Sequence, residues 1–242
     1  MPFRIYQSPT ARGHCECPLS RIFCDLPEAA LRDFESLGMQ MHLPKGAVLF
    51  QEGDLAGGIT VLCEGQIKLQ STSREGKIVI LKIAMPGDIL GLGAVLSETC
   101  HEMTAGTLEP TTVKNIRKDE FLSFLNRHAQ ASMYAARVLS EGYKTAFFDA
   151  CSLTSAPSAA GRLASILLDL SRGRFNDERA RPFTMALTHE ELANLTGTSR
   201  ETVTRMLSRF KRERWIQVDG SSMTILAWER LLQLVSPTND LA

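Results

Sequence analysis

The sequence lacks several features that would each point to a class of protein. None of its apolar runs approaches the roughly 18 residues that a membrane-spanning helix needs, so we expect no membrane partner. Residues 1–18 contain no apolar core of signal-peptide length, and we therefore expect a cytoplasmic protein. The 27 basic and 27 acidic residues leave no net charge, so any attraction to a polyanion must be confined to one region. Because the chain has no Gly-rich phosphate loop, Gly-x-Ser-x-Gly elbow, His-Glu-x-x-His run or clustered carboxylate pair, we expect it not to be an enzyme.

The length and the apolar content allow two modest domains. In a chain of 242 residues, a hydrophobic fraction of 44% is enough for each domain to have its own core. Six cysteines in a cytosolic chain favour free thiols, a metal or redox chemistry over a disulfide framework.

Residues 188–218 have the pattern of two short helices joined by a tight turn. Thr188 can cap the first helix, and Glu191 three positions on completes a capping box. Gly197 ends that helix, and Ser199 can cap a second one. The apolar stripe of the second helix consists of Val203, Met206, Leu207 and Phe210. This pattern predicts a helix-turn-helix whose polar face is free to enter a major groove.

The polar face of the second helix has the chemistry that base reading requires. Arginine can donate two hydrogen bonds to guanine, and glutamate can accept one from the cytosine amino group. Residues 196–214 contain six basic residues against two acidic ones, a local surplus that can neutralise phosphates. A solvated amphipathic helix is the alternative interpretation of the same charges. The predicted DNA-contacting residues are Thr188, Ser199, Arg200, Glu201, Thr204, Arg205 and Arg209.

The apolar period changes to two between Met41 and Ile116. Short alternating runs are separated there by turns that contain glycine, which is typical of a β sandwich or a jelly-roll barrel. The expected strands cover residues 48–50, 59–63, 67–70, 78–83, 89–90, 104–108 and 111–116.

Helices are expected on both sides of this β region. One begins at Glu28 and stops before Gly38, and another covers residues 119–126. A long helix follows from about Ala129 to Leu153, and heptad spacing within it predicts a homodimer seam. Packing of this helix on its own β domain is the alternative. The seam residues are Leu139, Tyr143, Ala146, Ala150 and Leu153.

The predicted fold class is α+β, with a β jelly-roll domain, a long dimerisation helix and a winged helix-turn-helix domain. A hinge at residues 154–158 precedes a new amphipathic helix, and the wing is a hairpin formed by residues 216–225. A strand at 183–185 and a last helix at 228–235 complete the second domain. The expected boundaries are 1–27 for an N-terminal arm, 28–128 for the β roll, 129–154 for the dimerisation helix and 155–242 for the DNA-binding domain.

Four segments together resemble the CRP/FNR family of bacterial transcription regulators, over about residues 14–236. They are Lys45–Asp54, Glu64-Gly65, Pro86-Gly87-Asp88 and Thr198–Arg205. The resemblance implies a cyclic-nucleotide-binding-type β roll, a dimerisation helix and a winged helix that binds palindromic promoter DNA. It also implies contact with RNA polymerase.

The resemblance further implies a half-site that contains TGA. The family reads it with Glu and Arg at the positions held here by Glu201 and Arg205. Arg200 matches an additional Arg of the cAMP-receptor branch, and Thr204 stands where the oxygen-responsive branch often has Ser, so the half-site combines features of both branches.

The N-terminal cysteines resemble those of the FNR branch, which bind an oxygen-labile [4Fe–4S] cluster. The resemblance makes Cys15, Cys17 and Cys24 candidate ligands, although the first pair is C-x-C rather than C-x-x-C. The position that aligns with the family's fourth cysteine is Lys114. Cys100, in a predicted loop, is therefore the preferred fourth ligand over Cys63 and Cys151, which lie in a predicted strand and helix.

Other signals stay open at this point. The N-terminal thiols can form a redox switch, bind zinc or be a vestige of a lost cluster. Haem is a further alternative, because His14, His42, His101 and His128 are available, but no haem-attachment run is present. A different small effector in the β roll, with cysteines that sense nothing, is also compatible with the sequence, as is an effector-binding module without DNA affinity.

Cyclic AMP is not expected as the effector. The cAMP branch holds the cyclic phosphate with Gly-Glu-Leu and a downstream Arg-Ala pair. The matching stretches here are Gly91-Leu92-Gly93 and Thr104-Ala105-Gly106, with no Arg nearby. A buried phosphate without a cationic partner is unfavourable.

Overall fold

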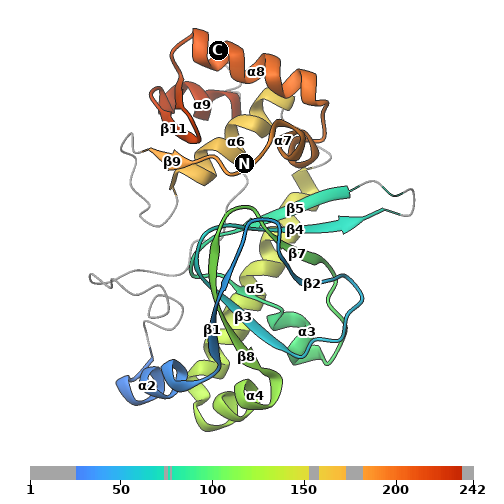
Figure 1. The fold of residues 1–242 in the computed structure, drawn as a ribbon, viewed down its shortest axis with the longest axis vertical. Helices are drawn as coiled ribbons and strands as arrows, with labels where there is room; N and C mark the ends of the chain where they lie inside the picture. Colours follow the sequence, from blue (N-terminus) through green and yellow to red (C-terminus); the bar gives the residue numbers. More distant parts are fainter. Residues whose placement is uncertain (1–25, 74–75, 77, 153–157, 173–181, 236–242) are drawn as a thin grey trace, which may run out of the picture. The chain divides into compact units, whose positions relative to one another are not determined.

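The computed structural model describes residues 26–73, 76, 78–152, 158–172 and 182–235 of the chain (Figure 1). The chain divides into two compact units, with the boundary between Tyr143 and Lys144, inside one long helix. Within the described ranges, no helix combines the length and the apolar character needed to cross a membrane.

The first unit is a roll of two antiparallel four-stranded sheets. One sheet has the order β1-β8-β3-β6 and the other the order β2-β7-β4-β5. The first is formed by β1 (Met39–Leu43), β8 (Thr111–Arg117), β3 (Gly58–Glu64) and β6 (Ile89–Leu90). The second is formed by β2 (Val48–Phe50), β7 (Thr104–Thr107), β4 (Ile67–Thr72) and β5 (Ile78–Ala84). Every strand expected from the alternating pattern is present.

Three helices and the first part of a fourth, as far as Tyr143, complete this unit. They are α2 (Glu28–Ser36), α3 (Leu92–Ser97), α4 (Lys118–Arg127) and α5 (Ala129–Ser152). Phe34 of α2 packs against Phe124 of α4, with ring centroids 5.4 Å apart, and both rings are buried. Burying a side chain of this size contributes about 1.5–3 kcal/mol, so the aromatic pair holds the two helices together. Gly38 ends the α2 segment where a Cβ would lie 2.2 Å from the Asn115 carbonyl oxygen, so only glycine fits.

Polar contacts fix α2 at the corner between α4 and α5. The Asp33 carboxylate accepts a hydrogen bond from His128 Nε2 at 2.8 Å and forms an ion pair with an Arg127 guanidinium nitrogen at 3.0 Å. Because His128 immediately precedes α5, the helix that follows the N-terminal arm is tied to the start of the long helix.

The second unit is a small helical domain with a three-stranded sheet of order β10-β11-β9. Its elements are α6 (Ala159–Arg172), β9 (Phe183–Thr184), α7 (His189–Thr196), α8 (Arg200–Arg212), β10 (Ile216–Asp219), β11 (Ser222–Ile225) and α9 (Trp228–Val235). Leu163, Leu167, Phe210 and Leu231 are fully buried and form its core. The predicted helix-turn-helix and the wing hairpin β10–β11 are both present, which confirms the α+β fold class.

Two elements were not predicted as such. Strand β1, Met-Gln-Met-His-Leu, alternates apolar and polar residues in the sequence, but four of its five residues are exposed, so the alternation does not correspond to a buried face; the strand pairs with β8. Helix α3 is only six residues long and lies between Gly91 and Glu98, both in the left-handed conformation. Gly91 before its start and Gly93 within its first turn are poor helix formers, so the sequence gives little sign of a helix here.

Candidate nucleic-acid interface

Helix α7 begins at a reciprocal cap. Thr188 Oγ1 accepts a hydrogen bond from the Glu191 N–H (3.2 Å), and the Glu191 carboxylate accepts one from the Thr188 N–H (2.9 Å). The helix ends at Gly197, whose φ of +58° lies in the left-handed region that glycine adopts without steric cost. The predicted capping box and glycine stop are confirmed, and they determine where the chain turns toward α8.

Helix α8 buries one side and exposes the other. Ser199 Oγ accepts the Thr202 N–H at 3.2 Å and caps the helix. Val203, Leu207 and Phe210 are buried, while Met206, predicted in the same stripe, is only half-buried. In Figure 1, α6, α7 and α9 lie on one side of α8. The opposite side of α8 is therefore available to a partner.

A buried contact holds the end of α7 in position. Arg162 of α6 donates from Nε to the Thr196 carbonyl oxygen at 2.6 Å, and Thr196 is almost completely buried. The last carbonyls of a helix have no partner inside the helix, so this bond satisfies one of them. The α7–α8 turn is thus supported from below by α6.

Glu201 and Arg205 lie one turn apart on the exposed face of α8. Hydrogen bonding to its own backbone N–H, then to the Ser199 hydroxyl, and the nearby Arg200 charge keep the pKa of Glu201 below its usual value. The carboxylate is therefore ionised at neutral pH and can only accept hydrogen bonds. Among the residues that the structure describes, Arg200 and Arg205 form no ion pair, so their guanidinium groups are available.

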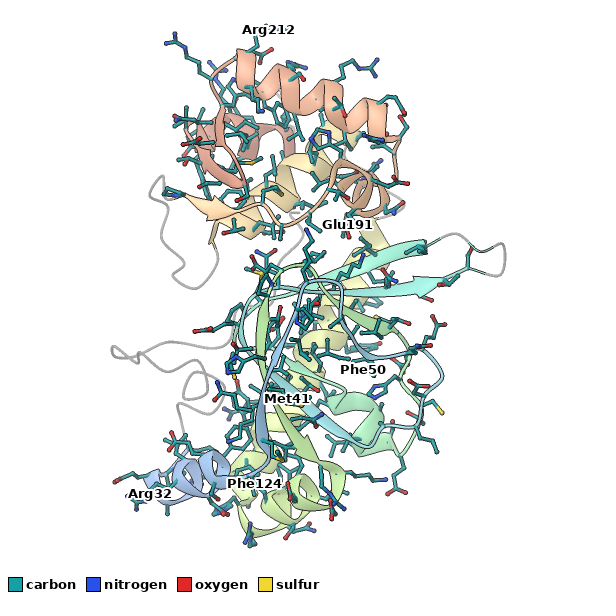
Figure 2. The ribbon with its side chains drawn as sticks, viewed as in Figure 1. Arg32, Met41, Phe50, Phe124, Glu191 and Arg212 are labelled. Carbon is teal, nitrogen blue, oxygen red and sulfur yellow. The ribbon has the colours of Figure 1, made fainter. Side chains whose placement is uncertain are left out.

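The basic end of α8 has a structural explanation as well as a functional one. Arg209 pairs with Glu213 at 2.8 Å and lies over the Trp215 ring at 5.6 Å. Cations in the last turn also stabilise a helix through its dipole. Arg212 points away from the other helices of its unit (Figure 2). Arg209 is therefore held along the protein surface, whereas Arg200 and Arg205 are not.

His189 also belongs to this surface, although its place in the sequence does not indicate a DNA contact. Its Nδ1 lies 2.8 Å from Thr204 Oγ1, so the first residue of α7 contacts the exposed face of α8. Their separation of fifteen positions along the chain conceals this contact in the sequence. The helix-turn-helix geometry brings them together.

The proposed cluster ligands are only in part within the described residues. Cys15, Cys17 and Cys24 lie outside them. Cys100 is half-buried, and its backbone forms an isolated bridge with Leu55. Within the ranges that the structure describes, no group of three or more His, Cys, Asp or Glu side chains could hold a metal ion.

Lys114 stands where the resemblance places the family's fourth cysteine. Its side chain is buried in β8, and Nζ donates to the carbonyl oxygens of Phe34 (3.1 Å) and Glu35 (2.7 Å) at the end of α2. An ammonium cannot ligate iron, and here it already has oxygen partners. The described residues therefore do not fit a cluster held from this strand.

The turn that matches the family's phosphate-binding turn is packed against protein. Leu92 is buried, and a Cβ on Gly91 would lie 3.0 Å from the His101 ring. That ring stacks on Phe50 with 3.8 Å between centroids. Burial lowers the pKa of His101, and the Asp54 charge opposes this shift only in part. A lowered pKa favours the neutral ring, which provides no fixed cation for a phosphate.

Apolar side chains on α5 are exposed in the single chain. Leu139, Tyr143 and Phe147 recur at steps of four and are 38%, 72% and 54% exposed, and Ala146 is exposed beside them. Of the other predicted seam residues, Leu153 lies outside the described residues and the side chain of Ala150 is not described. An exposed apolar stripe of this kind marks a surface that another protein can cover.

Each of the two units contains a region that matches a known protein family. The cyclic nucleotide-binding domain family matches residues 40–128, and the Crp-like helix-turn-helix domain family matches residues 161–234. The chain is 28% identical to the CRP-like cAMP-activated global transcriptional regulator of Mycobacterium tuberculosis, covering 87% of this chain and 94% of that protein. It is also 28% identical to the Anaerobic regulatory protein of Haemophilus influenzae, covering 96% and 91%.

Solved structures share the fold. FixK2 from Bradyrhizobium japonicum superimposes with a TM-score of 0.73 at 19% identity, covering 82% of this chain and 97% of that one. The catabolite activator protein of Thermus thermophilus gives a TM-score of 0.51 at 25% identity, covering 90% and 98%. With a cyclic nucleotide-binding β roll, a Crp-like helix-turn-helix and relatives named as transcription regulators, the chain belongs to the CRP/FNR family of DNA-binding transcription regulators.

Proposed function

We propose that this protein reads palindromic promoter DNA with the exposed face of α8. Glu201 and Arg205 are the principal base-reading residues, and TGA is the core of the half-site. The observation that carries the proposal is the pair itself, an ionised acceptor and an arginine without an ion pair among the described residues, one turn apart near the start of a capped helix. Glutamate accepting from cytosine and arginine donating to guanine are standard readouts of opposite strands.

The other predicted contacts divide into two roles. Arg200 joins the base-reading face, since it precedes Glu201 and is exposed. Arg209, Thr188 and Ser199 position the protein on the backbone, because Arg209 is already engaged with Glu213 and the two hydroxyls cap helix starts. Backbone contacts fix register and orientation but carry no direct sequence information.

The DNA-binding form is a homodimer in this proposal. A palindrome needs two recognition helices related by a twofold axis. The exposed stripe Leu139, Tyr143, Ala146 and Phe147 supplies an apolar surface with the spacing of a helix seam. The promoter-bound dimer contacts RNA polymerase in this proposal.

Alanine variants of the reading pair test this function. Glu201→Ala and Arg205→Ala should each lose about 1–3 kcal/mol of discrimination between the palindrome and its single-base variants, while the fold stays intact. The measurement is fluorescence anisotropy with a labelled palindrome and its variants. Glu229→Ala and Arg230→Ala are matched controls, since both are exposed in the same unit on α9. Equal discrimination by wild type and both α8 variants would count against the proposal.

The signal that the protein senses is proposed to be oxygen, redox state or nitric oxide, acting on the N-terminal cysteines. The support is the resemblance of the cysteine segment and similarity to relatives named as anaerobic regulators. A bound [4Fe–4S] cluster would supply oxygen-labile redox chemistry. Because Lys114 provides no thiolate, the cluster ligands would be Cys15, Cys17, Cys24 and Cys100. In the other form of the proposal, the same cysteines carry no cluster and respond to the signal as free thiols.

Anaerobic reconstitution with iron and sulfide separates these forms. A four-cysteine cluster should give visible charge-transfer absorption that Cys100→Ser removes. Cys63→Ala is the control, because Cys63 is buried in β3. A colourless wild type that keeps titratable thiols would eliminate the cluster and leave the thiol form.

A further inference from the structure

The Thr204 hydroxyl group lies between two hydrogen-bond partners. Its Oγ1 is 2.9 Å from the Arg200 carbonyl oxygen and 2.8 Å from His189 Nδ1. A carbonyl oxygen can only accept, so the hydroxyl hydrogen is donated to Arg200. A hydroxyl has a single hydrogen, and the bond to His189 is therefore one in which Nδ1–H donates and Thr204 accepts. Both the neutral Nδ1–H tautomer and the imidazolium satisfy this arrangement.

These two bonds determine what Thr204 presents to DNA. Its hydrogen is directed into the backbone of α8, and its oxygen is engaged by α7. Thr204 is nevertheless an exposed residue, one position before Arg205 on the reading face. The hydroxyl has no hydrogen left to donate and a single lone pair left to accept with, whereas the methyl group carries no polar partner. In the major groove only thymine offers a matching apolar group, its C5 methyl.

We propose that Thr204 reads a thymine of the half-site through methyl–methyl contact, and that His189 is the positioning residue that holds Thr204 in this orientation. This inference rests on the proposed function, since it assumes that α8 enters the major groove. It differs from a hydroxyl readout, in which the same side chain would bond an adenine or cytosine amino group. The two modes make opposite predictions for variants that separate the methyl from the hydroxyl.

The experiment uses the full-length protein and a palindrome with TGA half-sites. Each thymine of the half-site, on either strand, is replaced in turn by deoxyuridine, which removes only the C5 methyl. At one position wild-type affinity should fall about fourfold per half-site, the equivalent of about 0.8 kcal/mol per buried methyl group, and therefore about sixteenfold when both half-sites are changed.

Variants of Thr204 then identify the group that makes the contact. Thr204→Val loses the hydroxyl and its bond to His189, but valine carries a methyl group at both γ positions and so presents one without that bond; it should retain the sensitivity to deoxyuridine. Thr204→Ser keeps the hydroxyl and loses the methyl, so it should bind the thymine and deoxyuridine palindromes equally. Because the residue is exposed, neither change should alter the thermal unfolding midpoint, which is measured on the same samples.

The role of His189 is tested in the same assay. His189→Ala should reduce the thymine preference without removing DNA binding, and His189→Asn, whose amide can place an N–H near the Nδ1 position, should restore it. A preference retained by Thr204→Ser and lost by Thr204→Val would overturn the methyl readout, and so would a wild type indifferent to every thymine. Unchanged preference in His189→Ala would overturn the positioning role. A wild type that binds no palindrome would instead refute the proposed function on which the inference rests.

Discussion

A single buried ammonium holds the end of α2 against the β roll. Lys114 Nζ donates to the Phe34 and Glu35 carbonyls in the last turn of α2, where carbonyls lack their usual donor within the helix; the Phe34 oxygen also accepts the Leu37 N–H at 3.2 Å. The negative end of the helix dipole also favours a cation at this place. The contact therefore combines satisfied hydrogen bonds with favourable electrostatics at a buried position.

Replacing Lys114 with methionine should destabilise the first unit. Lys114→Met keeps most of the side-chain volume but leaves the Glu35 carbonyl without its Nζ donor and the Phe34 carbonyl with only the Leu37 N–H, at a cost of about 1–3 kcal/mol in the free energy of unfolding. Urea denaturation followed by circular dichroism measures the change. Lys118→Met is the control, because its partner Glu98 is largely exposed and such a pair contributes about 0–1 kcal/mol. A loss no larger than that of the control would show that the carbonyl contacts contribute little.

A side-chain contact can be predicted from the sequence when its two partners are close together along the chain. The capping box of Thr188 and Glu191 spans three residues, so its pattern is visible in the sequence. The partners of Lys114 are about 80 residues away, and nothing local marks a surface lysine from a buried one. His189 and Thr204 come together only because α7 and α8 pack. Long-range side-chain pairs of this kind require the tertiary fold.

At the scale of elements, the long helix α5 has two different environments along its length. Ala131, Tyr134 and Ala135 near its start are buried in the core of the first unit. Further along, Tyr143 and Phe147 are exposed. The buried portion packs on the helix's own β roll, and we propose that a second copy of the chain covers the exposed portion. The two interpretations of the sequence would then apply to different turns of one helix.

Charge placed in the exposed stripe should separate the protomers. Tyr143→Glu puts a carboxylate where the proposed seam is apolar, and two such groups would face each other across a twofold axis. Analytical ultracentrifugation should show a shift from twice the chain mass of 26.7 kDa toward the monomer. Lys144→Glu, at the next exposed position off the stripe, should leave the dimer intact. A monomeric wild type would contradict the proposed seam.

Elements with strong periodicity were predictable, and those defined by their neighbours were not. The strands of the roll, the helix-turn-helix and the wing carry clear apolar patterns. Strand β1 exists because β8 provides its hydrogen-bond partners, and α3 because glycine at position 91 can adopt φ +78°. A local pattern has no access to either cause.

At the scale of the whole molecule, a neutral chain carries a locally basic DNA-binding helix. Acidic residues elsewhere balance the six basic side chains of residues 196–214. Attraction to phosphate should therefore be short-ranged and confined to α8 and its surroundings, since screening limits charge interactions to about 8 Å at physiological salt. Specific binding then depends on base contacts more than on overall charge.

The salt dependence of DNA binding should report these local phosphate contacts. Lys211→Ala removes an exposed cation near the end of α8 and should lower the slope of log K against log salt by about one per protomer, without changing base preference. Titrations of the palindrome between low and physiological salt provide the measurement. Arg230→Ala on α9 should leave the slope unchanged. Equal slopes for wild type and Lys211→Ala would place this residue away from the duplex.

The contact at the end of α2 joins the Lys114 ammonium to two peptide oxygens, and neither kind of group reacts with dioxygen or nitric oxide. Metal–thiolate bonds at the same place would break under oxidising conditions, whereas the Lys114 hydrogen bonds do not respond to either gas. Cys24 is separated from the first described residue, Leu26, by Asp25 alone. We therefore expect a reaction at that thiol to act first on the start of α2, while Lys114 continues to hold the end of α2 against β8.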